Sequence, residues 1–253
     1  MKATEQQAIK KISIFGVPFS TLTMRETVDY LTQVVERREP HHIITANPIM
    51  VMAAVNDEKM MRVMKQADLI VPDGAGIIWA ANYVNEPLPE RVTGFDLLHE
   101  LMRVGEQRRW RVFLLGTTQE IITEAANNLK LQYPLVDIVG VQNGFFGPTE
   151  DDEVVARIVE AAPDMLFVAR SATTQEPWIA QFRDRLNVPI MMGVGGSFDI
   201  ISGKMKRAPV IFQKLRLEWF YRLAKEPARY KRMLALPKFV VKVVREKENV
   251  TKP

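Results

Sequence analysis

The 253-residue chain contains no cysteine. Disulfide bonds and thiolate zinc sites are therefore excluded, and a reducing compartment suits such a chain. No apolar run approaches the roughly 20 residues that a helix needs to span a bilayer, and the polar N-terminus Met1–Gln7 lacks the apolar stretch of a secretory signal. These absences predict a protein that starts out in the cytoplasm.

Two cofactor motifs are also missing. No GxxxxGK[ST] phosphate loop occurs, and the glycine-rich run Gly193–Gly196 does not fit GxGxxG because Phe198 stands at the third glycine position. An oxidoreductase that uses a nicotinamide cofactor is therefore disfavoured. The three histidines, His41, His42 and His99, are not spaced as metal ligands and are expected to be structural. We predict no metal site.

Charge is distributed very unevenly. Residues 1–203 carry 19 Lys and Arg against 26 Asp and Glu, a net charge of −7, whereas residues 204–253 carry 15 against 4, a net of +11. The overall charge of +4 hides this contrast. We therefore expect a catalytic body over residues 1–203 and a basic C-terminal segment over residues 204–253.

Short apolar runs alternate with helix-length segments through the first 200 residues. This alternation predicts an α/β fold, a Rossmann-like and mainly parallel sheet with helices on both faces. A capping box is expected where Thr23 precedes Glu26 by three residues. The strands are predicted at 11–15, 42–45, 69–71, 111–115, 137–141, 165–169 and 189–192, and further helices at 48–66, 74–83, 94–107, 118–131, 150–161 and 175–186.

Polar and glycine residues follow the predicted strands at their carboxyl ends. In a parallel sheet these ends share one edge, where ligands bind. A single glycine loop is explained by a tight turn, but five together favour a ligand cleft. The loops are Thr45–Pro48, Pro72–Gly76, Gly116–Thr118, Asn143–Gly147 and Gly193–Ser197.

Asp73 is the sharpest candidate for chemistry within these loops. It stands between Pro72, which stiffens the loop, and Gly74, which allows a substrate close to the backbone. A helix is expected to follow at once, so Asp73 could instead be an N-cap. Arg91, in a proline-rich loop, could bind a phosphate bidentately or pair with Glu90.

The last 50 residues contain basic segments with the residue pattern of amphipathic helices. Phe212–Leu223 places Leu215, Trp219, Phe220 and Leu223 at helical spacing, and Phe239, Val240, Val243 and Val244 lie among lysines further on. Such helices are typical of a membrane surface. Two other interpretations stay open at this point: nucleic-acid binding, and a solvated face packed on the body.

Several motifs together resemble one known family. They are TANP at 45–48, PDGAG at 72–76, PLPERVTGFDL at 87–97, FLLG at 113–116, NGFF at 143–146, TQExW at 174–178, GVGGSFDxxSGKxKRAP at 193–209 and LEWxYRLxxEPxRYKR at 217–232. This set is similar to the WecG/TagA/CpsF glycosyltransferases, the N-acetylmannosaminyltransferase family of bacterial cell-surface polymer synthesis. The resemblance covers nearly the whole chain.

The resemblance implies an inverting transfer of N-acetylmannosamine from a UDP-sugar to undecaprenyl-diphosphate N-acetylglucosamine, as in synthesis of the teichoic acid linkage unit. It implies no metal and no cofactor, which agrees with the absence of a DxD element. The enzyme would act as a peripheral protein on anionic lipid at the inner face of the cell membrane. Nucleic acid is not an expected partner, and a homo-oligomer stays open.

The resemblance also implies roles for particular residues. Asp73 would be the general base, and Arg222, Arg229 and Arg232 would reach the diphosphates. The remaining substrate-binding residues would be Thr45, Asn47, Arg91, Gln175 and Asp199.

One departure from the family pattern lies in 169–176, where a glycine, a proline and a lysine usual in the family are absent and Arg170 adds a charge. The departure concerns the identity of the donor sugar, because UDP-linked mannosaminuronic acid and UDP-linked glucose are alternative donors within the family. A non-catalytic, nucleic-acid-binding α/β protein is the alternative of another class.

Overall fold

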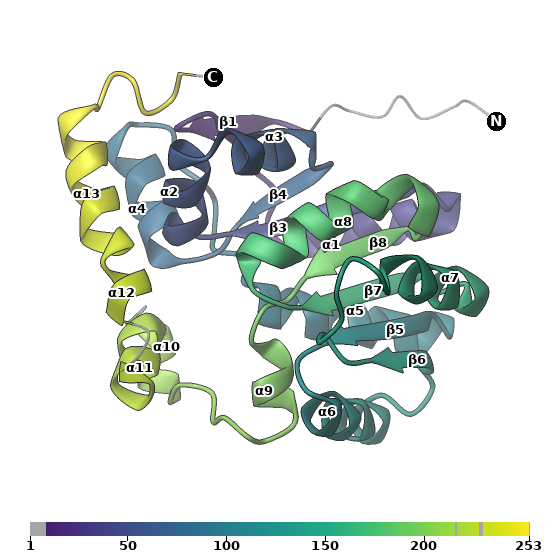
Figure 1. Ribbon diagram of the computed structural model, residues 1–253. Coiled ribbons are helices and arrows are strands. Elements are labelled where there is room, and N and C mark those ends of the chain that lie inside the picture. Colours follow the sequence, from purple (N-terminus) through teal and green to yellow (C-terminus); the bar gives the residue numbers. More distant parts are fainter. Residues whose placement is uncertain (1–8, 216, 228–229, 253) are drawn as a thin grey trace.

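The computed structural model describes residues 9–215, 217–227 and 230–252, with the side chains of Lys214 and Arg222 left out of that description. Its centre is a six-stranded parallel sheet of order β4-β3-β8-β7-β5-β6 (Figure 1). The strands are β3 His41–Ala46, β4 Leu69–Pro72, β5 Arg111–Gly116, β6 Asp137–Gln142, β7 Met165–Ala169 and β8 Ile190–Gly193. The predicted α/β class is confirmed.

Apolar side chains explain why these segments form inner strands. Every residue of β4, β7 and β8 is buried, because helices cover both faces of the sheet. Helices α1, α5, α6 and α9 pack on one face, and α3, α7 and α8 on the other. The strands therefore present their polar loops only at their ends.

The helices largely match their predicted spans. Thr23 forms the expected capping box with Glu26 at the start of α1. The predicted helix over 48–66 is two helices, because Asp57 is extended and caps the second one through Lys59 N. The helices of the body are α1 Met24–Arg37, α2 Pro48–Asn56, α3 Glu58–Gln66, α4 Ala75–Tyr83, α5 Gly94–Arg108, α6 Gln119–Gln132, α7 Asp151–Ala161, α8 Ala172–Leu186 and α9 Ser197–Ile201.

The first predicted strand belongs to a separate hairpin. β1 Lys11–Ile14 pairs antiparallel with β2 Val17–Ser20, which the sequence analysis did not predict. Phe15 and Gly16 form the turn, and both have positive φ. The hairpin packs beside β4 rather than joining the parallel sheet.

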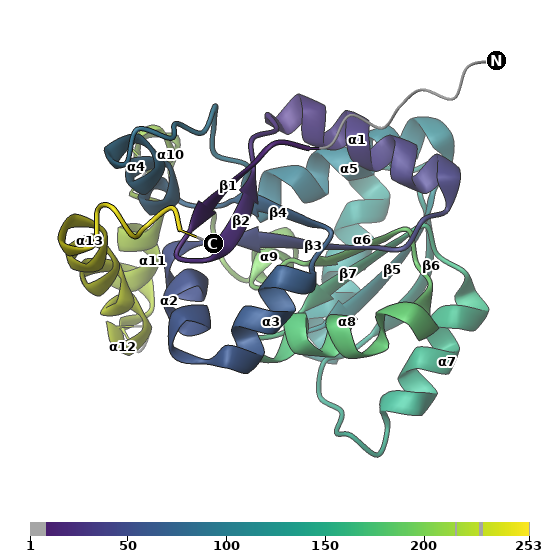
Figure 2. The same cartoon turned by 90° about the horizontal axis from the view of Figure 1, so that it is seen from above.

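The C-terminal segment forms four short helices: α10 Val210–Lys214, α11 Glu218–Lys225, α12 Tyr230–Met233 and α13 Ala235–Arg245. The single helix predicted over 212–223 is wrong, since α10 and α11 are separate. Among the described residues no helix is both long and apolar enough to cross a bilayer. The segment instead runs along α2 and α4 at one end of the sheet (Figures 1 and 2).

Two residues predicted as membrane anchors face inward. Phe239 and Val243 are fully buried in one cluster with the hairpin, and the Phe239 ring meets the Phe15 ring edge-on at 6.1 Å. Phe15 N also donates to Val250 O at 2.7 Å. The membrane interpretation of Phe239 and Val243 is therefore wrong, because helical spacing cannot tell a lipid-facing side from a core-facing one. The division at residue 203 stays a prediction.

We predict that Phe239→Ala lowers the free energy of unfolding by about 3–5 kcal/mol, since it leaves a cavity in a packed core. Urea denaturation measures this change. Val241→Ala is the matched control, because Val241 is exposed and lies two residues further along the same helix. Its free energy of unfolding should stay within about 0.5 kcal/mol of that of the parent. Equal stability of the two variants would show that α13 adds nothing to the core.

Candidate active site

A cleft lies at the carboxyl ends of the strands, and residues of α11, α12 and α13 line its outer wall. Seven of the nine predicted site residues line it: Thr45, Asn47, Asp73, Arg91, Gln175, Asp199 and Arg232. Arg229 and the side chain of Arg222 lie outside the described residues. The loops from distant parts of the sequence are therefore brought together as expected.

Asp73 follows β4 and is directed toward the start of α5. Its backbone N–H donates to Ala46 O at 2.9 Å, which extends the pairing of β3 and β4. Its Oδ2 accepts from Gly94 N, the first residue of α5, at 3.4 Å. The N-cap of α4 is Gly74, at φ 106°, and makes no side-chain cap bond. Asp73 is thus not the cap of α4, and its carboxylate is held at the cleft.

Thr45 and Asn47 sit beside this carboxylate. Thr45 is the next-to-last residue of β3 and is packed against Gly94. Asn47 caps α2, its Oδ1 accepting from Ile49 N at 3.0 Å and Met50 N at 3.2 Å. Because the oxygen of Asn47 is engaged, Nδ2 is the group that can donate to a substrate oxygen.

Gln175 is held in place by a buried hydrogen-bonded pair, Glu176 and His42. Its Nε2 donates to Glu176 Oε1 at 2.7 Å, and Glu176 Oε2 lies 2.8 Å from His42 Nε2. Its Oε1 accepts from the backbone N–H of Arg170 and of Gly195, at 3.2 and 3.3 Å. The Gln175 amide therefore joins two loops of the cleft floor.

Gly193 fits this network because it has no side chain. A Cβ there would lie 2.2 Å from Glu176 Oε1 and 2.3 Å from Gln175 Nε2. Such contacts are impossible without moving the pair. The glycine therefore serves close packing beneath the cleft.

The other two histidines are structural, as expected. His41 Nε2 lies 2.8 Å from Tyr30 Oη, and His99 Nδ1 lies 2.9 Å from Tyr133 Oη. Burial lowers the pKa of His99, which favours its neutral form. Among the described residues no three His, Asp or Glu side chains are grouped as metal ligands would be.

Arg91 pairs with Glu218 of α11 rather than with the neighbouring Glu90. Its Nη2 lies 2.8 Å from Glu218 Oε2, and both side chains are less than one-fifth exposed, at 19% and 17%. Arg207 Nε lies 3.7 Å from Glu218 Oε1, and Arg207 Nη2 lies 2.8 Å from Asp96 Oδ1. Arg91 thus lines the cleft, where a carboxylate contacts it, and its role in binding substrate stays a prediction.

The sequence analysis gave no cleft role to three residues that line the cleft: Arg207, Glu218 and Trp219. Arg207 lies within the quoted 193–209 motif, but its charge was counted only toward the basic tail. Trp219 was read as a membrane anchor, although it also lines the cleft. The Arg170 guanidinium stacks over the Phe146 ring at 4.6 Å.

Comparison with known proteins agrees with this geometry. The sequence model of the glycosyl transferase WecG/TagA/CpsF family matches residues 12–253. A relative from Bacillus subtilis (strain 168), named N-acetylglucosaminyldiphosphoundecaprenol N-acetyl-beta-D-mannosaminyltransferase, is 34% identical over 94% of this chain and 92% of its own length.

Relatives of the same name have similar coverage in two further organisms. The one from Bacillus spizizenii (strain ATCC 23059 / NRRL B-14472 / W23) is 35% identical over 88% of this chain and 86% of its own length. The one from Staphylococcus aureus (strain MW2) is 33% identical over 100% of this chain and 99% of its own length. The family match and the identity and coverage of these relatives show that the chain belongs to the WecG/TagA/CpsF family of glycosyl transferases.

Proposed function

We propose that this glycosyltransferase moves N-acetylmannosamine from a UDP-linked donor to N-acetylglucosamine carried on undecaprenyl diphosphate. The observation that carries the proposal is the placement of Asp73 in a cleft that also contains Arg91, Arg207 and Arg232. A cleft with a carboxylate and several arginines suits a reaction in which the acceptor hydroxyl loses a proton and the donor releases a diphosphate. The relatives' names supply the acceptor and the sugar.

The chemistry proceeds by one displacement at the anomeric carbon. The acceptor hydroxyl gives its proton to the Asp73 carboxylate as its oxygen forms the new bond to that carbon. The bond to the UDP oxygen breaks at the same time, and UDP leaves with the electron pair. Attack opposite the leaving group inverts the configuration. A positioned base contributes roughly 10²–10⁴-fold to such a step.

The leaving diphosphate needs positive charge in a site with little water. Guanidinium groups supply it through paired N–H donors that match phosphate oxygens. Arg91 comes from the body, and Arg207 and Arg232 come from the C-terminal segment. We propose that these groups act without a metal, so that transfer survives EDTA.

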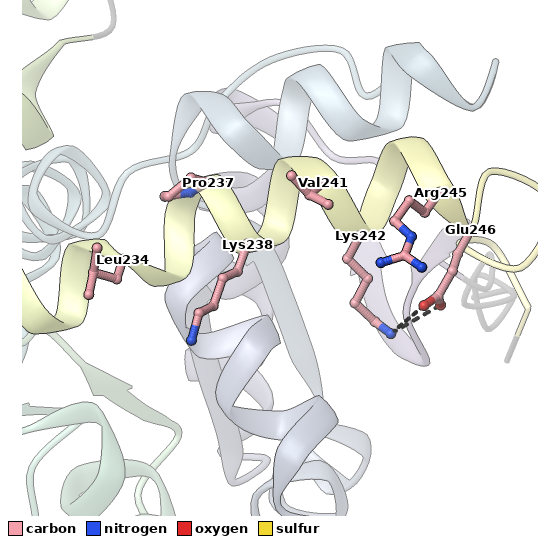
Figure 3. A pocket seen from close by; sticks show the side chains of 7 residues that line it. All are labelled: Leu234, Pro237, Lys238, Val241, Lys242, Arg245 and Glu246. Carbon is pink, nitrogen blue, oxygen red and sulfur yellow. Dashed lines mark hydrogen bonds and ion pairs between the residues drawn. The ribbon is translucent and has the colours of Figure 1, made fainter.

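The outer surface of the C-terminal segment suits an anionic membrane. Its exposed apolar side chains are Val210, Ile211, Leu215, Trp219, Phe220, Tyr230, Leu234, Val240, Val241 and Val244. Along α13 a groove combines apolar Leu234, Pro237 and Val241 with basic Lys238, Lys242 and Arg245 (Figure 3). We propose that this surface holds the enzyme at the inner face of the membrane, where a lipid-linked acceptor resides.

Asp73→Asn is expected to lower the transfer rate by about 10²–10⁴-fold while UDP binding and thermal stability stay close to those of the parent. Asparagine keeps the size of the side chain but cannot accept the proton. The measurement is transfer to a lipid-diphosphate N-acetylglucosamine acceptor, with a panel of UDP-sugars that includes the uronic acid and glucose donors.

Asp57→Asn is the matched control, because Asp57 caps α3 away from the cleft and asparagine caps equally well. It should transfer at the parent rate. Near-parental turnover by Asp73→Asn would remove Asp73 as the base. Transfer of a different sugar would correct the donor and leave the reaction class standing.

Replacing Leu215 and Phe220 together by serine should weaken binding to anionic phospholipid vesicles by about tenfold or more, since two large apolar groups lose their burial in lipid. Co-sedimentation measures the binding. Neither side chain lines the cleft, so UDP affinity should not change. Leu131→Ser on α6, where Leu131 is 82% exposed, is the control and should bind as the parent does. Unchanged sedimentation of the double variant would reject this surface as the anchor.

A further inference from the structure

Four charged side chains form a closed cluster where the C-terminal segment meets the body. Arg91 and Arg207 are the cations, and Asp96 and Glu218 are the anions. Glu218 lies between the two arginines, 2.8 Å from Arg91 Nη2 and 3.7 Å from Arg207 Nε. Arg91, Arg207 and Glu218 all line the catalytic cleft.

The four described side chains of this cluster carry two positive and two negative charges. A diphosphate that bound these arginines would add at least two negative charges to a partly buried site. Like charges that are brought together with little water repel strongly. Moving one of the two carboxylates away from the arginines removes one negative charge and so lowers this repulsion.

Asp96 is built into the body and cannot easily leave. It belongs to the first turn of α5, where its backbone N–H donates to Thr93 Oγ1 at 3.1 Å and its Oδ2 accepts from the Thr93 hydroxyl at 2.6 Å. It also keeps Arg207 in place, together with the Phe95 ring, which lies 4.5 Å from the guanidinium carbon.

Glu218 is the carboxylate that can move. It begins α11, a helix of eight residues on the C-terminal segment, and among the described side chains it is paired with the two arginines. The two carboxylate oxygens of Glu218 face different guanidinium groups, as two oxygens of a diphosphate would. Glu218 therefore has the sign of charge and the paired oxygens of a diphosphate, the ligand that the proposed function assigns to this cleft.

Building on the proposed function, we infer that Glu218 occupies the diphosphate position between Arg91 and Arg207 in the empty enzyme, and that the diphosphate of a substrate displaces it. Arg207 is accordingly a binding residue for that diphosphate. The exchange also links the ligand to the wall of the cleft, because Trp219 follows Glu218 and lines the same cleft.

The test measures binding of UDP, and separately of a short-chain isoprenyl diphosphate, to the full-length protein by titration calorimetry. Glu218→Gln keeps the shape of the side chain and removes its charge, so it should bind diphosphate about tenfold more tightly than the parent. Arg207→Gln should bind about tenfold more weakly. In the Arg207→Gln background, Glu218→Gln should raise the diphosphate affinity by a smaller factor than it does in the parent, because the two residues act on one ligand.

Glu246→Gln is the matched control. Glu246 is also a carboxylate of the C-terminal segment paired with a cation, Lys242 at 2.8 Å, but it does not line the cleft. It should bind as the parent does. Unchanged or weaker binding by Glu218→Gln would overturn the inference, since Glu218 would then only hold α11 in place. Thermal unfolding of each variant confirms that it is folded.

The two ligands tell the sources of the diphosphate apart. Tighter binding of UDP alone assigns the site to the donor, and tighter binding of the isoprenyl diphosphate alone assigns it to the acceptor. Both results support the exchange. If the parent binds neither ligand, the proposed function itself fails, whereas parental binding without a gain in Glu218→Gln rejects only the exchange.

Discussion

The arrangement of the cleft depends on the buried carboxylate of Glu176. A charge taken out of water is tolerated only when both oxygens have partners. His42 from β3 meets one oxygen and Gln175 meets the other. Because Gln175 in turn accepts from the loops after β7 and β8, this buried pair fixes α8 against β3 and against both loops. The same pair requires a glycine at position 193, because a Cβ there would clash with Glu176 and Gln175.

Strand positions could be predicted from sequence because they depend on local composition. Runs that are apolar throughout, such as Met165–Ala169, identify strands covered on both faces. The gathering of Asp73 and Asn47 followed from the parallel sheet alone. The break at Asp57 was missed because the apolar spacing continues across it. The partner of Arg91 was missed for another reason: Glu218 lies far along the chain, and no spacing rule connects two residues that meet only through the fold.

The C-terminal segment shows where composition misleads. Its basic and apolar residues indicated a single lipid-facing surface, yet the same short helix supplies both an inner and an outer side. Phe239 and Val243 complete the core beside the hairpin, while Val241 and Val244 remain exposed. An amphipathic helix always has an apolar side, and only the position of the body decides what that side covers. The family match adds the reaction class, which neither periodicity nor packing could supply.

The contact between the hairpin and the end of α13 also affects the order in which the protein can be assembled. The Ser13 hydroxyl donates a hydrogen bond to Lys252 O, which lies 239 residues further along the chain. Phe15 packs with Phe239 and Val250 in one core cluster. Contacts so far apart in sequence form late, because a long loop must close before they contribute. The hairpin is synthesised well before α13, and Phe15 gains its contact with Phe239 only when α13 has formed. The outer wall of the cleft is thus completed last, so a nascent chain has a sheet and a base before it has an enclosed site.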